Sequence, residues 1–107
     1  MKNVHEMTEL ECRAEIAEHR NPHWYDHSTM VGWEHPVPRT LDAAASSLPE
    51  AWWWEIFQHH DHWLAVASKT GPQEEKLIRH CYPAPTERLA RFRCAVAAWR
   101  FMKGIKE

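Results

Sequence analysis

The side chains best suited to metal chemistry gather in a short polar run, 59–62 (HHDH), between two apolar stretches. A second group lies in 23–27 (HWYDH). Structural zinc sites hold the ion with four N, S or O ligands in a tetrahedron. Neighbouring residues of a strand point to opposite faces, so His59 and His60 are badly placed to share one ion. Because no Cys-x-x-Cys spacing accompanies either group, we expect a polar hairpin turn and no bound metal or cofactor.

A second kind of chemistry would use His80 and Cys81, a base next to a thiol nucleophile. Their side chains diverge if both lie on a strand, and they then cannot act on the same substrate atom. A nuclease instead needs clustered carboxylates for Mg²⁺, or a histidine beside phosphate-binding arginines. Glu55 and Asp61 are the only acids near the HHDH run. The sequence therefore predicts a protein without enzymatic activity.

These residues lie in a region, 51–82, whose pattern predicts antiparallel strands joined by turns. Its first stretch, 51–58 (AWWWEIFQ), alternates between an apolar face and a mixed face. The returning strand is expected at 63–68 (WLAVAS), and a third at 77–82 (LIRHCY). The apolar face of the first strand carries Trp52, Trp54 and Ile56, and the mixed face carries Trp53, Glu55 and Phe57.

Three helices are expected around these strands, at 7–20, 40–48 and 86–102. Thr8 and Glu11 match a capping box at the start of the first helix. The last helix is apolar on most of its circumference, which predicts that it is well buried. The apolar stripe of the first helix would consist of Met7, Leu10, Ala14 and Ala17.

The remaining segments show little regular pattern. Residues 1–6 are expected to form a flexible arm, and 21–39 an irregular or extended connection, because Pro36 and Pro38 exclude a helix there. The length of 107 residues predicts a single domain, 1–107. The expected fold class is α+β, with a small antiparallel three- to four-stranded sheet packed with about three helices.

The composition excludes several functional classes. A formal net charge of −2 opposes a general nucleic-acid binder, which needs a basic surface, so we expect no direct nucleic-acid binding. No run of apolar residues is long enough for a membrane span, and the N-terminal residues lack the apolar region of a secretory signal. The three cysteines are far apart in the sequence, and their odd number indicates reduced thiols of a cytoplasmic protein.

From residue 38 to 101 the layout resembles a family of small phage-encoded proteins, those of the phage ABA sandwich domain type. The resemblance implies a small α/β sandwich from a phage or prophage genome, acting in the cytoplasm of a bacterial host cell. It brings no family catalytic residues. The motifs that carry the resemblance are TLDAA (40–44), LPE (48–50), WWW (52–54), LARFRCAVAA (89–98) and, more weakly, VGW (31–33).

Small phage proteins often bind and block host machinery, so the resemblance implies a non-enzymatic protein-binding module that inhibits a host defence complex, as anti-CRISPR proteins do. Its partner would be a host protein or ribonucleoprotein complex. Glutamates spaced four and three residues apart on the first helix form an acidic ridge that could compete for a basic channel. Aromatic residues in the irregular segment would add binding hot spots. The candidate partner-binding residues are Glu11, Glu15, Glu18, Trp24, Tyr25 and Trp33.

Two other functions remain open at this point. The histidine-rich segments suit a small metal-binding domain. Exposed tryptophans also suit self-association, as in a phage assembly accessory that acts as an oligomer, and the sequence does not determine the oligomeric state. Acidic residues concentrate in the first helix and basic residues in the last. This asymmetry would pair the two helices with each other or with two sides of a partner.

Overall fold

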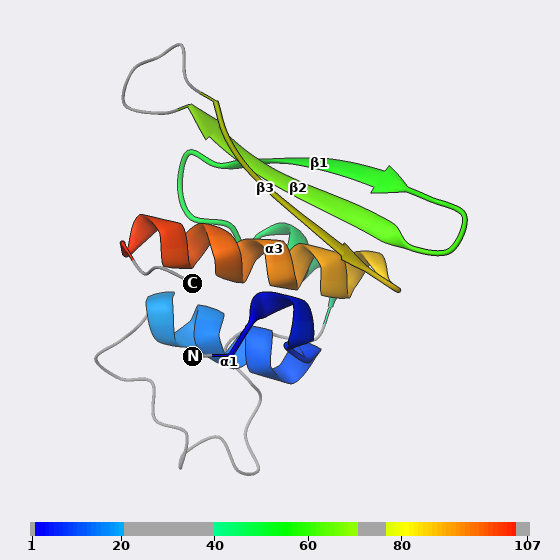
Figure 1. The fold of residues 1–107 in the computed structure, drawn as a ribbon. Helices are drawn as coiled ribbons and strands as arrows, with labels where there is room; N and C mark the ends of the chain where they lie inside the picture. Colours follow the sequence, from blue (N-terminus) through cyan, green and yellow to red (C-terminus); the bar gives the residue numbers. More distant parts are fainter. Residues whose placement is uncertain (1, 21–39, 71–76, 105–107) are drawn as a thin grey trace.

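In the computed structural model, which describes residues 2–20, 40–70 and 77–104, the chain forms three stacked layers. A three-stranded antiparallel sheet is one outer layer, helix α3 is the middle layer and helix α1 is the other outer layer (Figure 1). The expected α+β class is confirmed. The elements are η1 (Val4–Glu6), α1 (Glu9–Arg20), α2 (Leu41–Ala45), β1 (Trp53–Gln58), β2 (Trp63–Thr70), β3 (Leu77–Ala84) and α3 (Glu87–Met102).

The sheet has the strand order β1-β2-β3, so β2 is central and the other two strands are its edges. The register places Trp54 opposite Ala67, and Ala67 opposite His80. Trp54 and Ala67 belong to the hydrophobic core that includes α3, so this row of side chains faces the helix. The rows on either side of it face away, because successive side chains of a strand alternate. The predicted division of β1 into two faces is therefore confirmed.

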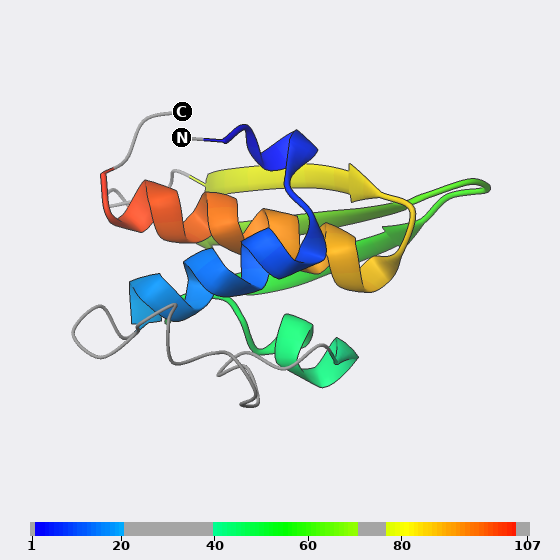
Figure 2. The same cartoon turned by 90° about the horizontal axis from the view of Figure 1, so that it is seen from below.

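Helix α3 is buried because other elements surround it. It packs against β2 and β3 on one side and against α1, α2 and η1 on the others. Figure 2 shows it between α1 and the sheet. Thr86 caps the first turn, since its hydroxyl accepts the N–H of Leu89 at 3.2 Å. The prediction of a well-buried last helix is confirmed, and its buried residues are Ala90, Phe92, Cys94, Ala95, Val96, Ala97, Ala98 and also Arg100.

Helix α1 begins with the predicted capping box. The N–H of Thr8 donates to Glu11 Oε1 at 2.9 Å, and the N–H of Glu11 donates to Thr8 Oγ1 at 3.2 Å. The predicted apolar stripe is partly wrong, because Leu10 is 61% exposed. The face that reaches α3 is centred on Cys12 and Ile16, both fully buried, and Leu10 lies on the other side of the helix.

The segment expected as a flexible arm is instead packed against the core over residues 2–6. Its 3₁₀ turn, η1, is capped by Asn3, whose side chain accepts the N–H of His5 at 2.9 Å. Val4 is completely buried, and the carbonyl of Lys2 accepts a hydrogen bond from Arg100 at 3.0 Å. One buried side chain and these hydrogen bonds fix the segment in place.

Helix α2 stops at Ala45, before the end of the expected range 40–48. The hydroxyl of Ser47 turns back to the preceding turn and donates to the carbonyl of Ala44 at 2.5 Å. The indole of Trp54 donates to the carbonyl of Ala45 at 2.7 Å, and that of Trp99 reaches the same loop. Side chains thus satisfy the carbonyls at the helix end, and the backbone is free to turn towards β1.

Two strands are longer than expected, since β2 continues to Thr70 and β3 to Ala84, whereas β1 begins at Trp53, two residues later than the expected range 51–58. The connection expected at 21–39 lies outside the described residues. Among the helices that the structure describes, none is both long and apolar enough to cross a bilayer.

Candidate functional site

The sheet has one face turned away from α3, and no described helix packs against it (Figure 1). We call this the outer face. Each strand contributes its alternate residues, as the register determines. The outer face consists of Trp53, Glu55 and Phe57 on β1, Leu64, Val66, Ser68 and Thr70 on β2, and Leu77, Arg79, Cys81 and Pro83 on β3.

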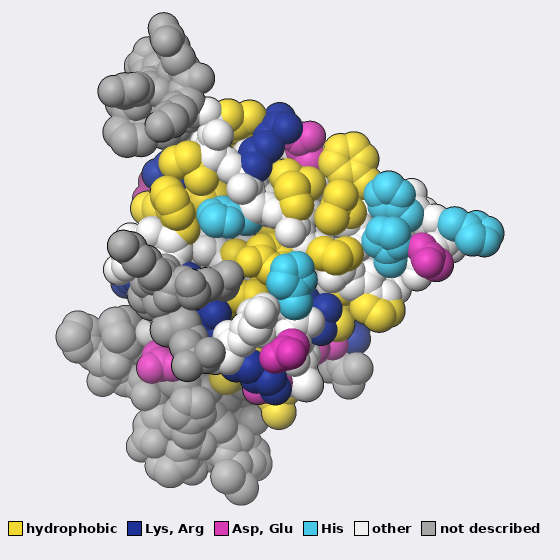
Figure 3. Space-filling view, in the orientation of Figure 1, with side chains coloured by type: hydrophobic (Ala, Val, Ile, Leu, Met, Phe, Trp, Pro, Cys, Tyr) yellow, Lys and Arg dark blue, Asp and Glu magenta, His cyan; other side chains and the backbone are white. Residues whose placement is uncertain are grey.

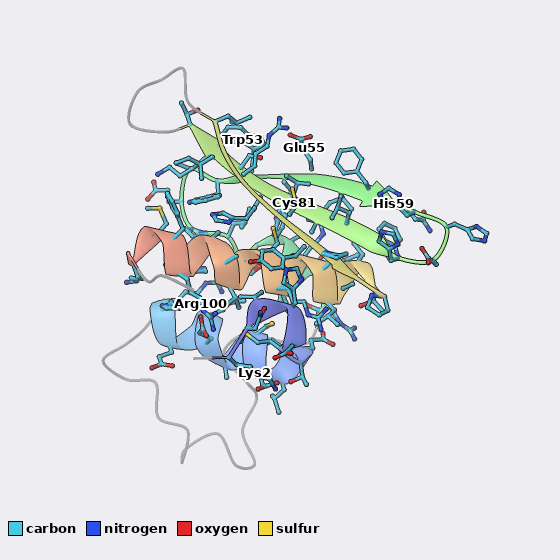
Figure 4. All side chains as sticks on the ribbon, viewed as in Figure 1. Lys2, Trp53, Glu55, His59, Cys81 and Arg100 are labelled. Atoms are coloured by element: carbon cyan, nitrogen blue, oxygen red, sulfur yellow. The ribbon has the colours of Figure 1, made fainter. Side chains whose placement is uncertain are left out.

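Large apolar side chains on the outer face are open to solvent. Trp53 is 41% exposed, and Phe57 and Leu77 are each 46% exposed. Figure 3 views the layers from the side, and hydrophobic side chains reach the surface in the upper part of that view, where the sheet lies. In Figure 4 the labelled Trp53 and Glu55 project from the side of β1 that is away from α3, whereas Arg100 lies on the helical side. The tryptophan-rich strand therefore supplies both the core and an exposed surface.

One ion pair lies in the middle of the outer face. Arg79 Nη2 of β3 is 3.6 Å from Glu55 Oε1 of β1, so the pair spans the central strand. The side chains are 53% and 39% exposed, and an ion pair this exposed adds little to the stability of the fold. Its main effect is to place one charge of each sign on a surface whose other described residues are uncharged.

Beneath this pair, two β2 residues are shielded without belonging to the main core. Val66 is only 5% exposed, although it lies outside the hydrophobic cluster around α3. Ser68 is fully buried, and its hydroxyl has no hydrogen-bond partner within the described residues. A buried hydroxyl without a partner is an unfavourable feature that the outer face carries.

The histidine run forms the expected polar hairpin turn at one end of the sheet (Figure 4). The N–H of His59 donates to the carbonyl of His62 at 2.8 Å, and the two rings stack with centroids 4.7 Å apart. His62 Nδ1 lies 2.6 Å from Asp61 Oδ1, and this hydrogen bond lowers the pKa of Asp61.

Over residues 2–20, 40–70 and 77–104, the structure contains no group of three or more potential metal ligands. The second histidine group, 23–27, lies outside these ranges. The described histidine turn therefore offers a polar loop and no assembled metal site.

The thiols and His80 do not form a catalytic arrangement in the described part of the chain. Cys81 is exposed on the outer face, whereas the ring of His80 faces α3, 5.5 Å from the ring of Phe101. The two side chains therefore diverge, as expected. Cys12 and Cys94 are buried, and burial raises the pKa of both thiols to about 12. Thiols with so high a pKa are poor nucleophiles.

The glutamates expected to form an acidic ridge have three different environments. Glu11 serves the capping box and also accepts two hydrogen bonds from Lys2, at 2.9 and 3.0 Å. The backbone N–H of Thr8, followed by Lys2, lowers the pKa of Glu11 to about 2. Glu15 points towards α3, and Glu18 is exposed. The structure thus leaves Glu18 as the one freely solvated member of the expected ridge.

Glu15 and Arg100 form the strongest polar contact between α1 and α3. Arg100 donates to both carboxylate oxygens, from Nε at 2.7 Å and from Nη2 at 2.6 Å. His19 Nε2 lies 3.0 Å from Glu15 Oε2. Burial alone would raise the pKa of Glu15, but the hydrogen bonds from His19 and Arg100 together outweigh it and lower the pKa to about 2.

Other basic residues of α3 also bind within the chain. Arg88 pairs with Glu9 across the helices, and its Nη2 donates to Glu9 Oε2 at 3.2 Å. Arg93 donates to the carbonyl of Met7 at 3.1 Å. Arg91 stays on its own helix with Glu87. Of the two outcomes expected from the charge asymmetry, the structure shows pairing of the two helices with each other.

The aromatic members of the predicted site, Trp24, Tyr25 and Trp33, lie outside the described residues. Comparison with known proteins finds no matching family model, no similar curated protein and no similar solved structure. The resemblance to the phage ABA sandwich family, and the partner class that it implies, therefore stay predictions.

Sequence reasoning missed two features of the structure. It placed Trp53 and Phe57 on a mixed face but did not identify that face as uncovered. The available signal was the element order, because β1 leads directly into β2 and β3 and is not followed by a helix that could cross this face. It also gave Arg100 no role beyond the basic charge of the last helix. An arginine at a seven-residue spacing from Arg93, on an otherwise apolar helix that must pack against an acidic one, was the available signal.

Proposed function

We propose that this chain is a non-enzymatic protein-binding module and that the outer face of the sheet is its docking surface. The observation that carries the proposal is the exposure of Trp53 and Phe57 on a face without a described helix over it. Aromatic side chains bury a large apolar area and dominate the energy of many interfaces. Exposed contiguous apolar surface on a small protein is typical of an interaction site.

The charges of this face favour a protein as the partner. Glu55 and Arg79 are its charged residues among those described, and they cancel each other. Nucleic-acid binding depends on several basic side chains that neutralise phosphates, and this face offers one arginine already paired with a glutamate. A folded protein with apolar and weakly polar surface fits the face better.

The narrower function, inhibition of a host defence complex in the bacterial cytoplasm, stays a prediction of the family resemblance. Its expected docking surface needs revision, because Glu11 and Glu15 are engaged inside the chain. Charge reversal of these two residues would now test stability more than binding. The outer face replaces the acidic ridge as the surface to be tested first.

A site-specific photo-crosslinker tests whether the outer face docks a protein. Phe57 is replaced by p-benzoylphenylalanine, and Leu10 on α1 provides the matched control, since it is also a large exposed apolar residue. Both variants are irradiated in bacterial cells that produce them. We expect discrete protein adducts from position 57 and few from position 10. Equal adduct patterns, or none from position 57, would contradict the proposal.

A further inference from the structure

We propose that the occupant of the outer face is a second copy of this chain, packed sheet against sheet around a two-fold axis that runs along β2. This inference rests on the proposed docking role of the outer face and names its partner. The resulting dimer would have two central sheets, with the helices of each copy on the outside. Stacked sheets of this kind lie about 10 Å apart.

The charges of the outer face are complementary to themselves. Glu55 lies on one edge strand and Arg79 on the other, on opposite sides of β2. A two-fold axis along β2 exchanges the edges, so β1 of one copy lies over β3 of the other. Glu55 then lies over Cys81 of the second copy, about 7 Å along the strand from Arg79 and within reach of its long side chain. Each arginine thus meets a glutamate of the other copy.

The other in-plane orientation lacks this match. An axis perpendicular to the strands would lay β1 over β1 and β3 over β3 of the second copy. Glu55 would then face the glutamate-bearing strand, and Arg79 the arginine-bearing strand. Like charges facing each other in a partly dry interface are unfavourable. The placement of the two charges therefore selects the axis along β2.

Shape supports the same axis. The outer residues of β1 include two large aromatic side chains, Trp53 and Phe57, whereas Cys81 and Pro83 of β3 are small or flat. Exchange of the edges sets the bulky edge of each copy over the flat edge of the other. It also brings Trp53 over Arg79, a favourable pairing of an aromatic ring with a guanidinium group. The partly exposed Leu64 of β2 meets its own counterpart at the axis.

The size of the face sets the expected strength of the dimer. Three strands span roughly 14 Å across and about 20 Å along their length. This footprint of roughly 280 Å² per copy is smaller than that of a standard specific interface, so a weak dimer is expected, with a dissociation constant of roughly tens to hundreds of micromolar. Dimerisation is therefore visible in sedimentation runs that extend from about 1 to about 300 μM protein.

Two charge-reversed variants provide the decisive test. Glu55→Arg leaves two positive charges on each outer face, and Arg79→Glu leaves two negative charges. Each reversal acts twice in a two-fold interface, so each variant alone should dimerise roughly 10- to 100-fold more weakly than the original chain. An equimolar mixture of the two should recover the dimer as a heterodimer. Both residues are exposed enough for the folds to persist, which circular dichroism verifies.

The mixture separates an interaction between copies from the ion pair within one copy, because mixing cannot repair a pair inside a single chain. Recovery on mixing supports the second copy as the occupant. A chain that is monomeric at every concentration overturns the second copy as the occupant. In that case the docking role of the outer face is still supported if position 57 gives adducts with other proteins in cells. If position 57 gives no adducts, the docking role is overturned as well.

A third variant removes the aromatic contact. Phe57→Asp leaves Glu55 and Arg79 unaltered and should also yield a monomer. A dimer of unchanged strength would overturn the proposal.

Discussion

The helical side and the outer face of this protein each contain an arginine–glutamate pair, and the two pairs serve different ends. Glu15 and Arg100 join α1 to α3, with side chains only 20% and 3% exposed. Glu55 and Arg79 lie on the sheet surface, 39% and 53% exposed. A charge that is buried must keep its partner, whereas a solvated charge can exchange its partner at little cost. The first pair therefore holds the fold, and the second is available for recognition.

The largest expected effect comes from breaking the buried pair. Glu15→Ala leaves the guanidinium of Arg100 buried without its carboxylate, so the free energy of unfolding should fall by about 3–5 kcal/mol. Glu55→Ala on the outer face removes an exposed partner and should cost about 0–1 kcal/mol. Urea denaturation followed by circular dichroism measures both.

A double substitution distinguishes the loss of the pair from the loss of packing. Glu15→Leu combined with Arg100→Met replaces both charges by apolar groups, which is often neutral or stabilising for a buried pair. We expect most of the stability lost in Glu15→Ala to return. If the double variant is as unstable as the single one, the packing of these side chains matters more than their charge, and the contrast between the two pairs fails.

Two neighbouring tryptophans on β1 allow the same comparison of the helical side with the outer face, with a smaller expected change in stability. Trp54 faces the core, donates to the carbonyl of Ala45 at 2.7 Å and lies under the guanidinium of Arg91. Trp54→Ala should reduce the free energy of unfolding by about 2–4 kcal/mol. Trp53→Ala, one residue away on the outer face, should reduce it by less than about 1 kcal/mol while weakening self-association.

Thermal unfolding and sedimentation on the same two variants check this division. Loss of stability without loss of association for Trp54, and the reverse for Trp53, is the expected pattern. A large loss of stability from Trp53→Ala would mean that the outer face belongs to the folding core.

This contrast also shows how far the sequence determines the structure. Alternation in AWWWEIFQ predicts which β1 residues share a face, because the side-chain period of a strand depends on local backbone geometry alone. The cap residues Thr8, Thr40 and Thr86 likewise mark helix starts, since a capping hydroxyl acts within three residues. Local rules of this kind are readable without knowledge of the fold.

The partners of charged residues depend on tertiary packing, so they were harder to predict from the sequence. Glu11, Glu15 and Glu18 have the spacing of a solvated ridge, but the rotation of α1 about its axis turns Glu15 towards Arg100. That rotation follows from how Cys12 and Ile16 pack on α3. The spacing alone predicts which residues share a helix face, and not what that face meets.

A pH titration tests the charge of the buried pair without changing the shape of its side chains. The folded pKa of Glu15 is about 2, below the ordinary value of 4.5, so its ionised form stabilises the fold. This contribution is complete above pH about 4.5 and is lost as the pH falls to about 2. The difference in unfolding free energy between the original chain and Glu15→Gln should shrink over this window.

Glu11 titrates in the same window from an exposed position, so Glu11→Gln is the matched comparison for that titration. Its effect should decline at the same pH but be smaller, because its partner Lys2 remains solvated without it. A difference for Glu15→Gln that is constant from pH 6 to pH 2 would show that Glu15 does not act through its charge.

The smallest expected effect lies beneath the outer face, at Ser68. Its fully buried hydroxyl has no hydrogen-bond partner within the described residues, and keeping such a group from water is unfavourable. Ser68→Ala removes the hydroxyl and leaves the small side chain, so the free energy of unfolding should stay equal or rise by up to about 1 kcal/mol. Ser47→Ala is the matched control, because that buried hydroxyl donates to the carbonyl of Ala44 and its loss should lower the free energy of unfolding by about 1 kcal/mol. Chemical denaturation measures the change in unfolding free energy of each variant and resolves their opposite signs. If Ser68→Ala loses as much stability as Ser47→Ala, the hydroxyl of Ser68 has a hydrogen-bond partner, and the outer face satisfies its polar groups as fully as the helical side does.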